Sequence, residues 1–207
     1  MTDELTREMR DSADITMITQ RVLRERESRD TGNWDQMRDC FHPDSLVRLS
    51  WFNGSGPDFV EGSIDMAKRG VLAKHRLSPV LVTLAGDRAI ASLSAIIDIP
   101  TVIDSVELML SAYSRFIYRV ERRDGTWRIY GFDCIYIRDE LTPTILGQTV
   151  VIDLGEIKSF RPSYRNLAYS LSLKGYQANP DLPGEDRPET VARLMQEVND
   201  WAGGIKE

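Results

Sequence analysis

Residues 106–138 read VELMLSAYSRFIYRVERRDGTWRIYGFDCIYIR and carry the clearest structural signal in the 207-residue chain. Apolar and polar side chains alternate along residues 106–122 and again along residues 126–138, a pattern typical of half-buried strands. Between them lies Asp124-Gly125, a strong signal for a two-residue hairpin turn. The stretch therefore predicts two long antiparallel strands joined by a tight turn.

Shorter segments on the N-terminal side extend this strand pattern. Residues 79–84 and 88–98 predict two strands that are joined at Ala85-Gly86-Asp87. Residues 45–52 predict one further, isolated strand, and the Gly- and Pro-containing residues 53–57 predict a loop after it. Together with the hairpin, these segments predict a meander of antiparallel strands.

Three helices are predicted before the meander. Residues 1–10 form a charged start that we expect to be frayed, and residues 12–29 then carry apolar side chains at helical spacing. Asn33 predicts the N-cap of a short helix that ends at His42-Pro43-Asp44, and Ser63 predicts the cap of a third. Because helices and strands are segregated along the chain, the fold class is α+β, with helices packed on one face of a curved sheet.

Residues 141–207 have a different pattern. They predict a short strand at 150–154, a helix at 163–174 and a last helix from Pro188. This region has too little apolar core to fold alone. The predicted organisation is one domain over residues 10–140, followed by a C-terminal extension that packs on the domain or on a partner subunit.

Composition limits the classes of function. The net charge of -6 argues against binding to nucleic acid, and no run of 18 apolar residues predicts a membrane-spanning helix. The N-terminus lacks the apolar core of a secretory signal, so the cytoplasm is the predicted compartment. The only cysteines are Cys40 and Cys134 and the only histidines are His42 and His75, so we expect no metal site. The sequence contains no Gly-rich phosphate loop that would indicate a nucleotide cofactor, and we expect no cofactor at all.

Two polar residues are candidates for catalysis. Asp30 lies at the end of the first predicted helix, where the partial negative charge of the helix C-terminus disfavours a carboxylate. The alternative for Asp30 is a solvated turn residue. His75 precedes the first strand of the meander and has the chemistry of a general base near neutral pH. The alternative for His75 is a surface histidine at a helix C-terminus.

Aromatic residues alternate along the predicted strands. Ser114, Phe116 and Tyr118 share one face of the strand over residues 106–122, and Trp51 ends the isolated strand. Such residues are usually half-buried core. They become the wall of a pocket if the sheet curves around a cavity.

The order of these motifs resembles the nuclear transport factor 2-like superfamily, in particular SnoaL-like proteins and scytalone dehydratase. Three stretches carry the resemblance over about residues 10–140: DTGNWDQMRDCF from Asp30, HRLSPVLVTLAGDRA from His75, and SRFIY from Ser114 with the hairpin RRDGTWRI that follows it. The resemblance implies a cone-shaped α+β barrel, in which a strongly bent, cystatin-like sheet wraps the long N-terminal helix around a deep apolar cavity.

The resemblance also implies a catalytic dyad. In scytalone dehydratase and hexachlorocyclohexane dehydrochlorinase an aspartate at the end of the first helix pairs with a histidine at the entry of the sheet, and Asp30 and His75 match these positions. The cavity would keep the histidine poised near neutrality. Trp51, Ser114, Phe116 and Tyr118 are the residues expected to bind substrate. The second active-site histidine of the dehydratase falls at Pro100 here, which argues against scytalone itself as the substrate.

The resulting functional hypothesis is a cofactor-free lyase or isomerase that acts on a small, mostly apolar cyclic molecule. The alternative is a non-catalytic ligand-binding or assembly module, similar to the small subunit of ring-hydroxylating dioxygenases. A third option, an epoxide hydrolase, needs a cluster of acidic and amide groups that the sequence does not display. The resemblance further implies a homodimer or a homotrimer.

Overall fold

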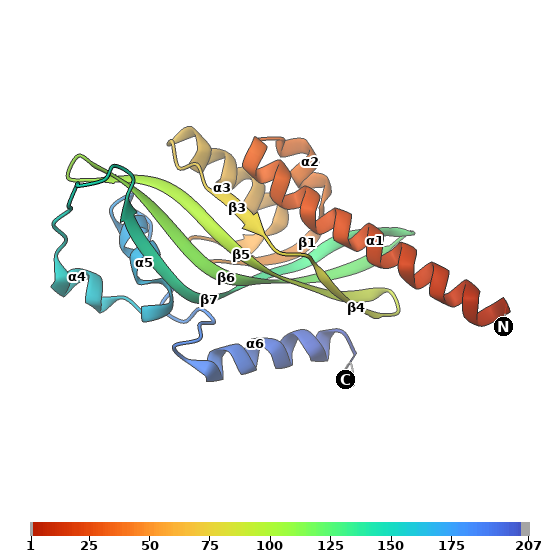
Figure 1. The fold of residues 1–207 in the computed structure, drawn as a ribbon. Helices are drawn as coiled ribbons and strands as arrows, with labels where there is room; N and C mark the ends of the chain where they lie inside the picture. The colour runs from red at the N-terminus through yellow and green to blue at the C-terminus, as the bar shows by residue number, and fades with distance from the viewer. Residues whose placement is uncertain (1, 204–207) are drawn as a thin grey trace.

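The computed structural model describes residues 2–203 and is organised around one bent, unclosed sheet (Figure 1). The strands follow the order β2-β1-β7-β6-β5-β3, and β4 pairs with β5. Their bounds are β1 (Phe41–Arg48), β2 (Asn53–Ser55), β3 (Lys74–Leu77), β4 (Leu81–Ala85), β5 (Arg88–Ile103), β6 (Val106–Arg123) and β7 (Thr126–Pro143). Every pair is antiparallel except β1 with β7.

The hairpin predicted from residues 106–138 is present as β6 and β7. Asp124 and Gly125 connect the strands with φ angles of 50° and 74°, the backbone that a type I′ turn requires and that matches the twist of the flanking strands. Strands of 16 to 18 residues give the sheet enough length to bend and to form the wall of a cavity.

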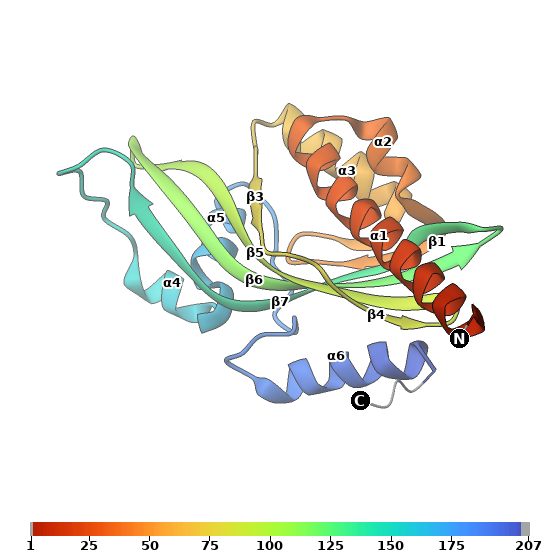
Figure 2. The ribbon, with the colours of Figure 1, turned by 45° about the vertical axis from the view of Figure 1, so that its right-hand side comes forward.

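Three helices cover one face of this sheet: α1 (Thr2–Thr31), α2 (Trp34–Asp39) and α3 (Gly56–Lys68) (Figures 1 and 2). Ile18 and Val22 of α1 are fully buried against the sheet. The predicted fold class, a curved antiparallel sheet around a long N-terminal helix, is therefore confirmed.

Several predicted boundaries are wrong. The helix α1 begins at Thr2 instead of near Ser12, because its exposed first turns are rich in strong helix formers such as Glu, Arg, Leu and Met and need no burial. The helix α3 begins at Gly56, capped by Ser55, so residues 53–57, predicted as a loop, are divided between β2 and this helix. Residue Ser63, the predicted cap, lies inside α3.

Two other short segments also differ from the prediction. Residues 42–44, expected to end a helix, belong to β1 and lie where its pairing with β7 shifts register, between Phe41 and Leu46. Residues 150–154 form no strand, because Asp153 accepts hydrogen bonds from the backbone of Gly155 and Glu156 and caps a helix instead.

The C-terminal residues contact both faces of the sheet. They contain the helices α4 (Leu154–Ser159), α5 (Arg165–Ser172) and α6 (Pro188–Trp201) and the short 3-10 turn η1 (Pro162–Tyr164). Apolar residues of α5 join the main core on the side of α1, whereas α6 runs along the opposite face of the sheet (Figure 2). Leu194 and Val198 of α6 pack there on Ile90, Ile117 and Ile135.

The helix α6 therefore covers part of the outer sheet face. The dimer or trimer stays a prediction. Among the residues that the structure describes, no helix is both long enough and apolar enough to cross a membrane.

Candidate functional site

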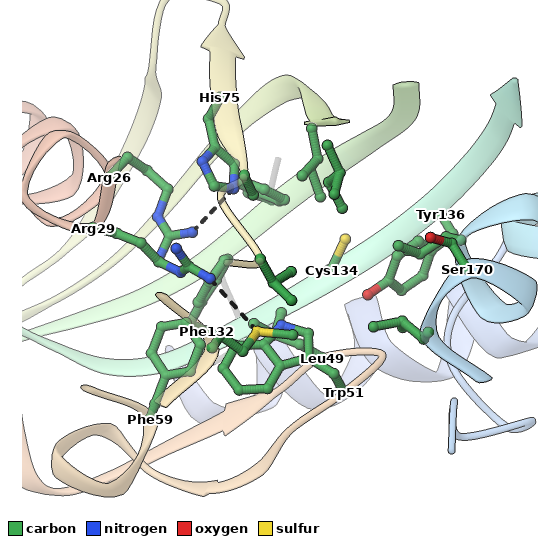
Figure 3. A pocket seen from close by; sticks show the side chains of 18 of the residues that line it. Arg26, Arg29, Leu49, Trp51, Phe59, His75, Phe132, Cys134, Tyr136 and Ser170 are labelled. Atoms are coloured by element: carbon green, nitrogen blue, oxygen red, sulfur yellow. Dashed lines mark hydrogen bonds between the residues drawn. The ribbon is translucent and has the colours of Figure 1, made fainter. Parts of the chain in front are cut away.

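An apolar cavity lies between the sheet and the helices α1, α3 and α5 (Figure 3). The cavity is partly open to solvent. Most of its wall is apolar, and this apolar part comes mainly from the sheet, α3 and α5, including Phe59, Met66, Ile97, Phe132 and Leu171. A cavity with this lining suits a small, mostly apolar ligand.

The structure brings Asp30 and His75 together at this cavity. Asp30 is the penultimate residue of α1, and His75 is the second residue of β3. The Asp30 Oδ1 atom lies 2.6 Å from His75 Nδ1, and the backbone N–H of His75 donates to Oδ2 at 2.7 Å. The side chains are only 16% and 4% exposed, so solvent competes little with their contact.

The unfavourable position of Asp30 at a helix C-terminus is compensated by its neighbours. Two N–H groups of His75 donate hydrogen bonds to the carboxylate, and the ammonium group of Lys74 binds the backbone carbonyl of Asp30. A cation at the last carbonyls of a helix offsets their partial negative charge. The helix end therefore holds the carboxylate in one orientation.

The pKa of His75 differs from the near-neutral value that the family resemblance implies. The pKa of His75 is lowered to about 4, because burial and the charge of Arg26 lower it more than the hydrogen bond that His75 donates to Asp30 raises it. Burial alone would raise the pKa of Asp30, but the hydrogen bond and charge of His75 outweigh it and the pKa is lowered. At neutral pH the pair is a carboxylate and a neutral imidazole.

The neighbours of His75 also fix its tautomer. The carboxylate of Asp30 is an acceptor, so the proton of the neutral ring lies on Nδ1. On the other side, Arg26 Nη1 lies 3.4 Å from Nε2, and an arginine can only donate. The unprotonated nitrogen is therefore Nε2, and its lone pair is the one with which His75 would act as a base in the cavity.

A buried ion pair of α1 lies next to the dyad. Glu25 is 0% and Arg26 2% exposed, and Arg26 Nε donates to Glu25 Oε2 at 2.5 Å while its Nη2 binds Glu25 Oε1. The hydroxyl of Tyr118 donates to Glu25 Oε2 at 3.3 Å. Burial lowers the pKa of Arg26, but the charge and hydrogen bonds of Glu25 raise it above its ordinary value, so Arg26 is always a cation.

A second arginine, Arg29, lines the same cavity one turn further along α1. It is 7% exposed, and burial together with the charge of Arg26 lowers its pKa to about 10. Figure 3 shows Arg26, Arg29 and His75 gathered on one side of the cavity, with Tyr136 and Ser170 at the other.

Of the four residues expected to bind substrate, two line the cavity and two do not. Trp51 and Phe116 line the cavity, and the Phe116 ring lies 5.9 Å from that of His75. Ser114 is buried and donates to the carbonyl of Ala95 at 3.3 Å, and Tyr118 is bound to Glu25 as described. Pro100 is exposed on β5, whereas its neighbour Ile99 reaches the cavity.

Sequence reasoning missed the charged residues of α1 and the contribution of α5. The sequence did contain a signal for the charged residues of α1. The three- and four-residue spacing of Ile18 and Val22 continues through Glu25, Arg26 and Arg29, which places them on the buried face of the helix. Leu167, Ser170 and Leu171 of α5 close the cavity, and nothing in their local pattern indicates that contact.

The donor groups of the cavity do not form a metal-binding set. Within residues 2–203, no three side chains of His, Cys, Asp or Glu are grouped so that they could hold a metal ion. The cavity lining contains no acid or amide side chain in this part of the chain, so the acidic and amide cluster of an epoxide hydrolase does not form there.

Comparisons with known proteins identify the family and the fold of the chain. A family model described as a SnoaL-like domain matches residues 10–133. An uncharacterised protein of Emericella nidulans is 30% identical over 191 residues, which cover 85% of this chain and 80% of the relative.

Two solved structures share the fold at low identity. A putative scytalone dehydratase of Novosphingobium aromaticivorans has a TM-score of 0.52 at 15% identity and covers 72% of this chain and 100% of its own. A hexachlorocyclohexane dehydrochlorinase of Novosphingobium barchaimii has a TM-score of 0.54 at 16% identity and covers 70% and 99%. At these identities the likeness extends to the fold alone.

Proposed function

Because the chain belongs to the SnoaL-like domain family, we propose that it is a cofactor-free lyase or isomerase that acts on a small, mostly apolar cyclic molecule. His75 is the base and Asp30 orients it. The observation that carries the proposal is the 2.6 Å contact between Asp30 Oδ1 and His75 Nδ1 at the wall of an apolar cavity. Proton abstraction requires a fixed tautomer with its lone pair on Nε2, and the substrate must displace the 3.4 Å contact of Arg26 with that nitrogen.

The chemistry of the cavity limits the reaction. A base whose conjugate acid has a pKa of about 4 is weak, so the C–H bond it breaks must be next to an electron-withdrawing group. In an elimination, the proton moves to Nε2 and the electron pair of the C–H bond forms a double bond as a leaving group departs. In an isomerisation, the double bond shifts and Nε2 returns the proton to another carbon. The guanidinium of Arg26, 3.4 Å from Nε2, stabilises the negative charge that develops beside the base.

A generic elimination probe tests this proposal without knowledge of the natural substrate. 5-Nitrobenzisoxazole is a flat, apolar ring compound that opens to a coloured cyanophenolate when one proton is removed. We expect the protein to accelerate this opening at the cavity, with saturation by the probe. A probe that binds but is not opened would contradict the enzyme proposal and favour a ligand-binding module.

The activity on the probe should depend on pH through His75. The base is active when it is neutral, so kcat/KM should be constant around neutral pH, fall as the pH drops through about 4 and change tenfold per pH unit below it. Stopped-flow mixing with circular dichroism on the same samples separates loss of activity from unfolding. A midpoint at the ordinary histidine value would show that burial and the arginines do not hold His75 neutral.

A further inference from the structure

The side chain of Arg29 is a buried cation without an anionic partner. It is 7% exposed, and its one hydrogen bond to a described residue goes from Nη2 to the sulfur of Met66 at 3.8 Å. Its guanidinium also lies 5.9 Å from the ring of Trp51. Thioether sulfur is a weak acceptor. Within residues 2–203, no carboxylate forms an ion pair with this guanidinium.

The two nearest carboxylates are already engaged. Both oxygens of Glu25 accept from Arg26, and one of them also accepts from Tyr118. Both oxygens of Asp30 accept from His75. Glu25 and Asp30 therefore act on Arg29 only through their charge at longer range. Burying a cation in this way costs free energy that a hydrogen-bonded counterion would return.

The cavity around Arg29 carries only positive charge on its wall. Arg26, Arg29 and the half-buried Lys174 are among its lining residues, and no aspartate or glutamate of the described chain is. Lys174 makes no ion pair in the described part of the chain, and burial lowers its pKa. The remainder of the wall is mostly apolar.

We propose that the ligand of this cavity is an organic anion, namely a small and mostly apolar ring compound with one carboxylate that Arg29 binds. This inference rests on the proposed function and names its substrate class. A planar guanidinium matches the two oxygens of a carboxylate, and one free arginine in apolar surroundings suits a single charge. Arg29 lies beside Arg26, whose Nη1 is 3.4 Å from His75 Nε2 (Figure 3), so the anion is held on the same wall as the base.

Two probes of equal shape test the charge of the ligand. 2-Naphthoate and 2-naphthamide differ only in the anionic group, and calorimetric titration at neutral pH measures their affinities. We expect the wild-type protein to bind naphthoate about 10- to 100-fold more tightly than naphthamide. Equal affinities, or a preference for the amide, would overturn the inference.

Substitutions then locate the site. Arg29→Met should lower the affinity for naphthoate by about 10- to 100-fold and leave that for naphthamide unchanged, and Arg29→Lys should restore part of the difference. Arg69→Met is the matched control, because it removes an exposed positive charge outside the cavity. If Arg69→Met loses as much affinity for naphthoate as Arg29→Met, the net charge of the protein explains the loss, and the proposed site at Arg29 is wrong.

The stability of the ligand-free variant separates binding from a structural role. Since no described carboxylate forms an ion pair with Arg29, Arg29→Met should melt at the same or a higher temperature than wild type. A lower melting temperature would show that the arginine holds the fold instead of a ligand. Turnover of 5-nitrobenzisoxazole together with equal binding of the two naphthyl probes would refute the anion site alone. Preferred binding of naphthoate without turnover would refute the enzyme proposal alone.

Discussion

Replacing His75 with alanine should lower kcat/KM for 5-nitrobenzisoxazole by about 10²- to 10⁴-fold, the usual contribution of a positioned general base. The imidazole has no substitute in the described chain, because the cavity wall holds no second histidine and no carboxylate. The thiol of Cys134 reaches the cavity, but burial raises its pKa to about 12, so it is not a base at neutral pH. Initial rates over a range of probe concentrations separate the effect on kcat from that on KM.

A second variant tests the other member of the dyad, and the other histidine of the chain offers a control. Asp30→Asn should reduce kcat in the same direction but by less, because the amide no longer fixes the proton on Nδ1. His42→Ala removes the only other histidine, which binds the carbonyl of Glu121 at 3.0 Å outside the cavity, and should keep the rate of wild type. Full turnover in both His75→Ala and Asp30→Asn would refute the dyad.

The fold could be predicted because the strongest local signals coincide with the longest strands. The alternation around Asp124-Gly125 fixes β6 and β7, and the segregation of helices and strands then leaves few α+β arrangements. The family was also predicted correctly. Boundaries such as the start of α3 were missed because Ser55 and Ser63 are equally good caps, and only pairing of residues 53–55 with β1 selects the first.

The candidate site was predictable only in part. The local physics of a helix C-terminus argues against a carboxylate at Asp30, and it took three-dimensional contacts with Lys74 and His75 to offset that cost. The lowered pKa of His75 depends on burial and on the charges of Arg26 and Arg29, which come from a different element. Likewise, the closure of the cavity by Leu171 joins residues distant in the sequence, and such packing has no local signature.

Replacing Glu25 with alanine should destabilise the protein by about 3–5 kcal/mol, because the substitution leaves Arg26 as an uncompensated charge in the core. Arg26 is 2% exposed and has no other carboxylate in hydrogen-bond contact within the described residues. The hydroxyl of Tyr118 also loses its acceptor. Urea denaturation at neutral pH measures the free energy of unfolding.

Two further variants test whether the cost arises from the unpaired charge. Glu27→Ala removes an exposed glutamate from the same helix and should change the free energy of unfolding by no more than about 0.5 kcal/mol. The double variant Glu25→Leu/Arg26→Met replaces the pair with apolar groups and should recover most of the loss, since buried ion pairs are often no more stabilising than apolar side chains of similar volume. If the double variant is as unstable as Glu25→Ala, the loss comes from packing and not from the buried charge. If it is stable but has lost activity on the probe, Arg26 serves the reaction and Glu25 serves to keep Arg26 in the core.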